Sequence, residues 1–76
     1  MRVGELEDLF LRTLLKQAGG NQRRWRLALG PVTLYDPATH PHCNWNVSPT
    51  GSAAENAVIE RLADDLRIAH PRVVPD

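Results

Sequence analysis

The chain has 76 residues and a formal net charge of zero, with nine basic and nine acidic side chains. This length accommodates one small domain, and an apolar content of 42% excludes a disordered chain. A core of this size usually needs a supplement, and the single cysteine, Cys43, excludes an internal disulfide. We therefore expect residues 1–76 to form one domain that is completed either by a metal ion or by a second protein surface.

The first predicted element is a helix over residues 5–18. Its apolar side chains recur with helical spacing and spread over roughly 240° of the helix surface, against the ~100° stripe that a surface helix normally buries. Gly19 and Gly20 then end the helix, because glycine adopts the left-handed conformation of a C-terminal cap without steric cost. The pattern predicts a helix with more apolar surface than one small sheet can cover.

Residues 23–29 alternate in polarity, which predicts a strand with Trp25, Leu27 and Leu29 on one face. The alternation resumes over residues 32–36, after an interruption at Gly30-Pro31. Either a tight hairpin lies at this interruption or one long strand bends there; we favour the hairpin.

A third predicted strand covers residues 42–48, where apolar and polar side chains again alternate. Ser52 and Glu55 have the spacing of a capping box and predict the start of a second helix over residues 53–69. Pro71 ends that helix, and residues 71–76 are expected to form a loose tail.

The order of elements predicts an α+β domain of two layers with the sequence α-β-β-β-α. Three short strands in this order most simply form an antiparallel meander, with both helices packed on its one apolar face.

The excess apolar surface of the first helix indicates a binding partner. A large exposed apolar patch on a small monomer favours association, so we expect Leu9, Leu11 and Leu15 to form an interaction surface. The expected function is a non-enzymatic protein-interaction module of the regulator, adaptor or inhibitor type. A homodimer through the first helix is the expected assembly, and the alternative is that the rest of the chain covers this helix.

The charges are unevenly distributed, although their sum is zero. Residues 9–35 carry +5, residues 1–8 carry −2 and residues 36–76 carry −3. Arg24 and Arg26 are expected on the outer face of the first strand, where they would contact acidic groups of a protein partner. The alternative function is a nucleic-acid-binding module in which Arg23, Arg24 and Arg26 contact phosphates.

A second alternative is a small zinc-binding domain, because the chain has a cluster of nitrogen and sulfur ligands. The four candidate ligands are His40, His42, Cys43 and His70. No spacing typical of a zinc module supports this set, so we favour a structural role for these residues and expect no metal or other cofactor. Catalysis by Cys43 is not favoured either, because its phase with Trp45 and Val47 indicates burial.

The expected location is the cytoplasm. Three of the first eight residues are acidic, whereas a secretory signal begins with basic residues followed by an apolar stretch. The lone thiol is typical of a reducing compartment, and no apolar run approaches the roughly 20 residues that cross a bilayer. We therefore expect no contact with a membrane.

Overall fold

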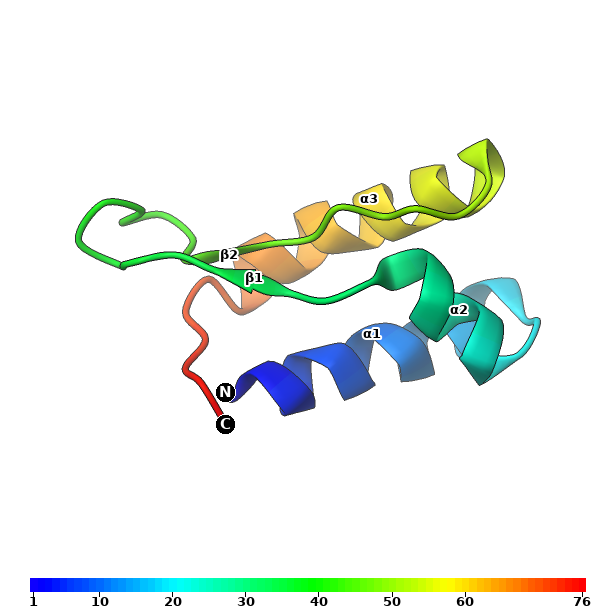
Figure 1. Ribbon diagram of the computed structural model, residues 1–76, viewed down its shortest axis with the longest axis horizontal. Coiled ribbons are helices and arrows are strands. Elements are labelled where there is room, and N and C mark those ends of the chain that lie inside the picture. Colours follow the sequence, from blue (N-terminus) through cyan, green and yellow to red (C-terminus); the bar gives the residue numbers. More distant parts are fainter.

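The structure, a computed structural model that describes residues 1–76, contains three helices and one two-stranded sheet. The elements in chain order are α1 (Val3–Ala18), α2 (Gln22–Leu29), β1 (Thr33–Leu34), β2 (Trp45–Asn46) and α3 (Ala53–Ala69). Figure 1 shows α1 and α3 running in opposite directions, with α2 at one end of the molecule and the loop between the strands projecting from the other. Each helix contacts the other two.

Both predicted long helices are confirmed. The helix predicted over residues 53–69 is α3 and has the predicted bounds. The helix predicted over residues 5–18 is α1 and begins two residues earlier than expected. At the start of α3, Ser52 Oγ accepts from the Glu55 N–H at 3.1 Å, and the Glu55 carboxylate accepts from the Ser52 N–H at 2.8 Å. Gly19 ends α1 with a φ of 72°, in the region that favours glycine.

The predicted strand over residues 23–29 is wrong, because this segment forms the helix α2. Asn21 caps its start, with Asn21 Oδ1 accepting from the Arg24 N–H at 2.8 Å. The buried residues Trp25, Ala28 and Leu29 have helical spacing, whereas Leu27 is exposed. Over seven residues the sequence fits both the strand period of two and the helical period of about 3.6. The segment forms a helix because the helix buries this face of α2 in the core.

The predicted three-stranded meander and the two-layer α-β-β-β-α order are therefore also wrong. Strands β1 and β2 alone form an antiparallel pair, in which Thr33 lies opposite Asn46 and Leu34 opposite Trp45. The predicted strands 32–36 and 42–48 shorten to these two residues each. Gly30-Pro31 is neither a hairpin nor a bend in a strand, because Gly30 is the C-terminal cap of α2 with a φ of 68°.

Residues 71–76 are attached to the domain, although we expected a loose tail. The Asn44 side chain donates to the Val73 carbonyl at 2.7 Å and accepts from the Val73 N–H at 2.9 Å. Both residues are buried, with Val73 1% exposed. Val74 then pairs with the N-terminus, donating to the Met1 carbonyl and accepting from the Val3 N–H at 2.9 Å each. The C-terminal segment thus joins β2 to the start of α1.

Trp45 connects the strands to the helices. Its ring meets Phe10 of α1 edge to face, with centroids 5.7 Å apart, and its indole N–H donates to the His70 carbonyl at 2.8 Å. The guanidinium of Arg67 lies over the same ring, 5.5 Å from its centroid. One continuous apolar core therefore includes residues from all three helices, β2 and the C-terminal segment.

We predict that Asn44→Ala destabilises the chain by about 3 kcal/mol, because it leaves the buried Val73 N–H and carbonyl without partners. Urea unfolding followed by circular dichroism measures this loss. The matched control is Asn21→Ala, which removes one exposed cap and should cost about 1 kcal/mol. Equal losses for the two variants would contradict the structural role assigned to Asn44.

Candidate functional site

The one salt bridge between two helices joins α2 to the start of α3. Arg24 Nε donates to Glu55 Oε2 at 2.9 Å, and Arg24 Nη2 donates to Glu55 Oε1 at 2.6 Å. Two parallel bonds of this kind hold both side chains in one orientation. Arg24 is therefore neutralised within the chain, although it stands in the most basic segment of the sequence.

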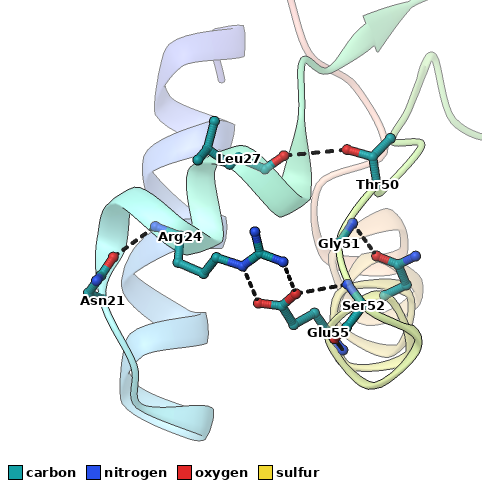
Figure 2. A network of polar contacts seen from close by, with 8 residues as sticks. Asn21, Arg24, Leu27, Thr50, Gly51, Ser52 and Glu55 are labelled. Atoms are coloured by element: carbon teal, nitrogen blue, oxygen red, sulfur yellow. Dashed lines mark hydrogen bonds and ion pairs between the residues drawn. The ribbon is translucent and has the colours of Figure 1, made fainter.

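A short segment before α3 fastens the same two helices. The Thr50 N–H donates to the Ala28 carbonyl at 2.8 Å, which gives a partner to a carbonyl at the C-terminal end of α2. The Gly51 N–H donates to Asn56 Oδ1 at 2.8 Å. A Cβ on Gly51 would lie 2.8 Å from the Cβ of Ala28, so the two backbones approach too closely for a side chain. Figure 2 shows this network between α2 and α3.

The face of α2 that points away from the core has a different character. Leu27 is 63% exposed, and Figure 2 shows its side chain pointing away from the Arg24–Glu55 pair. Arg23 lies one turn before it on the same face, and Arg26 lies beside it. Both arginines are exposed and neither forms a salt bridge. The outward face of α2, which is formed by Arg23, Arg26 and Leu27, thus combines an exposed aliphatic side chain with two unpaired positive charges.

The outward face of α3 has the opposite charge. Ile68 is 84% exposed, and Asp64 and Asp65 lie one turn before it. Asp64 Oδ1 accepts from Arg67 Nη1 at 2.8 Å, but its side chain remains 75% exposed and keeps an oxygen for a further cation. We define the outward face of α3 as Asp64, Asp65 and Ile68. Sequence reasoning missed Ile68, although it is the one large aliphatic residue of this helix outside the apolar arc.

The structure places the leucines of the predicted first-helix surface against the core. Leu11 is 1% exposed and belongs to the core, while Leu9 and Leu15 are half-buried and pack against it. The expected surplus of apolar surface on this helix assumed that only one other helix was present. With Leu11 buried and Leu9 and Leu15 half-buried against the core, the three leucines do not form an open outer flank.

The candidate zinc ligands do not gather into one site. His40 is exposed and stacks on Tyr35 with centroids 4.2 Å apart, and His42 is also exposed. Cys43 is half-buried, with its thiol donating to the Trp45 carbonyl at 3.4 Å. His70 caps the end of α3. No group of three or more histidine, cysteine, aspartate or glutamate side chains in the structure is placed to hold a metal ion.

The structure contains no pocket. None of the three helices combines the length and the apolar character that crossing a membrane requires.

Comparison with known proteins found no matching family model, no similar curated protein and no similar solved structure. The two outward faces each combine a large exposed aliphatic side chain with exposed charged residues.

We predict that the Arg24–Glu55 pair makes the stability of the chain depend on pH at the acid end. The hydrogen bonds from Arg24 and from the Ser52 backbone lower the pKa of Glu55 from its ordinary 4.5 to about 2. A carboxylate whose pKa is lower in the folded state than in the unfolded state stabilises the folded state. This contribution is complete at a pH above the unfolded-state pKa and is lost as the pH falls through the folded-state pKa. Stability from this pair is therefore present above pH 4.5 and is lost as the pH falls towards about 2.

Urea unfolding of the wild type and of Glu55→Gln over this pH range measures the effect. The glutamine keeps a side-chain oxygen for the Ser52 N–H but has no charge to titrate, so its midpoint should change less with pH. Glu60→Gln is the control, because Glu60 is exposed and forms no salt bridge. Parallel pH curves for the wild type and Glu55→Gln would show that the pair does not contribute.

Proposed function

We propose that this chain is a small non-enzymatic protein-interaction module that binds an acidic protein surface through the outward face of α2. The observation that carries the proposal is the exposed Leu27 beside two unpaired arginines. An aliphatic anchor flanked by charges of one sign suits a protein partner, because apolar contact supplies affinity and the charges select an acidic surface.

A protein partner accounts for this face better than a nucleic acid does. Of the three arginines that could contact phosphates, Arg24 is already bound to Glu55, which leaves Arg23 and Arg26. Nucleic-acid-binding domains are usually basic as a whole, whereas this chain has a formal net charge of zero. The large exposed leucine on this face adds nothing to phosphate binding.

The proposal retains the role of a regulator, adaptor or inhibitor, acting in the cytoplasm. It moves the interaction surface from α1 to α2, because Leu11 is buried and Leu9 and Leu15 pack against the core. The free thiol of Cys43 is compatible with a reducing compartment. Cys43 is half-buried and bonded to a backbone carbonyl, which favours a structural cysteine over a catalytic one.

Titration of the isotope-labelled chain, followed by NMR of its backbone amides, tests the proposal. Three probes are used: an amphipathic helical peptide of glutamate and leucine, its lysine and leucine counterpart, and a single-stranded oligonucleotide. We predict that the acidic peptide shifts the amides of Gln22–Leu29 and that the basic peptide does not. Leu27→Ala should weaken binding of the acidic peptide by about tenfold, because it removes the apolar anchor.

The matched control is Val74→Ala, which shortens an exposed aliphatic side chain away from α2 and should leave the affinity unchanged. Selective shifts of the α2 amides by the oligonucleotide would replace this proposal with the nucleic-acid-binding alternative. If none of the three probes shifts α2, the proposed surface is not a binding site.

A further inference from the structure

The outward faces of α2 and α3 match each other in spacing as well as in charge. In α2, Arg23 and Leu27 are four residues apart, and in α3, Asp64 and Ile68 have the same separation. Residues four apart lie one above the other on one side of a helix. Each face therefore has a charged side chain one turn before an exposed aliphatic one, and the two charges have opposite signs.

A parallel alignment of the two helices brings the aliphatic side chains together and sets the positive charges opposite the negative ones. When Arg23 is set opposite Asp64, Leu27 falls opposite Ile68, so one ion pair and one apolar contact form together. The remaining charges also correspond, because facing parallel helices bring opposite flanks together. Arg26 lies on the flank of α2 that meets the flank of α3 carrying Asp65.

The two arginines of α3 do not oppose this alignment. Arg67 is already bonded to Asp64 and lies over the Trp45 ring. Arg61 lies three residues before Asp64, about one turn towards the start of α3. In the same register it falls opposite Gly20, which precedes α2 and carries no charge. In this register Arg23 and Arg26 therefore lie opposite Asp64 and Asp65 and not opposite Arg61.

We propose that the outward face of α2 binds the outward face of α3 on a second copy of this chain, with the two helices parallel. This inference rests on the proposed function and names the acidic surface that α2 binds. Within one chain the two faces cannot meet, because both point away from the core that α2 and α3 share. Charge complementarity and the matched spacing identify the second copy as the partner.

Such a contact joins two different surfaces, so after the first contact forms one chain keeps an unused α3 face and the other keeps an unused α2 face. Two chains either close on each other by making the contact twice or extend into longer assemblies. Because α2 has eight residues, the contact area is small, and association should be weak and sensitive to salt.

Sedimentation equilibrium from ~10 µM to ~1 mM at low salt tests the proposal. The wild type should show a mass that rises above 8.5 kDa with concentration. Two charge-reversal variants are compared with the wild type: Arg23→Asp/Arg26→Asp and Asp64→Arg/Asp65→Arg. Each variant, measured by itself, should associate about tenfold more weakly than the wild type. An equimolar mixture of the two should recover association, with the two variants alternating one to one, because opposite charges face each other only in contacts between the two variants.

Two controls separate this contact from general charge effects and from loss of folding. Arg12→Asp and Glu60→Arg reverse charges outside the proposed contact and should leave the association of each variant like that of the wild type. Mixing two single variants, Arg26→Asp and Asp65→Arg, repeats the experiment without disturbing the Asp64–Arg67 salt bridge. Far-UV circular dichroism establishes that each variant keeps its helices.

The outcomes distinguish the two proposals. A wild type that remains at 8.5 kDa throughout, while the acidic peptide still binds α2, overturns self-association and leaves the proposed function in place. A monomer that also ignores the peptide removes both. Association that survives in the variants alone, or fails to return in their mixture, overturns the pairing of α2 with α3.

Discussion

The paired hydrogen bonds between Asn44 and Val73 are the contact on which the rest of the structure depends. They bury an amide side chain and a backbone segment together, and each group would be costly to bury without the other. By fixing Val73, they place the C-terminal segment between β2 and the first turn of α1. A sheet of two residues per strand supplies little stability alone, so the strands are held through this segment and through Trp45.

The small size of the chain also determines how the apolar side chains of α1 are buried. A chain of this length can complete a core only if nearly every element contributes to it, and α2 does so by placing Trp25, Ala28 and Leu29 against the core. Part of the apolar surface of α1 is thereby used within one chain. On the far sides of α2 and α3, Leu27 and Ile68 are exposed beside charges of opposite sign.

Much of the local structure could be predicted from short-range signals. The Ser52–Glu55 capping box and Gly19 defined helix ends that the structure confirms, because each acts within one turn of the chain. The error over residues 23–29 arose from alternation across too few residues to separate a strand from a helix. Asn21 and Gly30 were the available signals, since an N-cap and a glycine C-cap enclose this segment.

The sequence by itself determined the two long helices, the unequal distribution of charge and the absence of an internal disulfide, because these depend on neighbouring residues or on composition. Only the tertiary structure decided which charges are free. Arg24 and Glu55 are 31 residues apart, and no local pattern shows that they neutralise each other. The same holds for Leu11, which has the same local character as an exposed leucine until the folded core buries it. Burial and ion pairing are properties of segments brought together, and spacing along a single segment cannot define them.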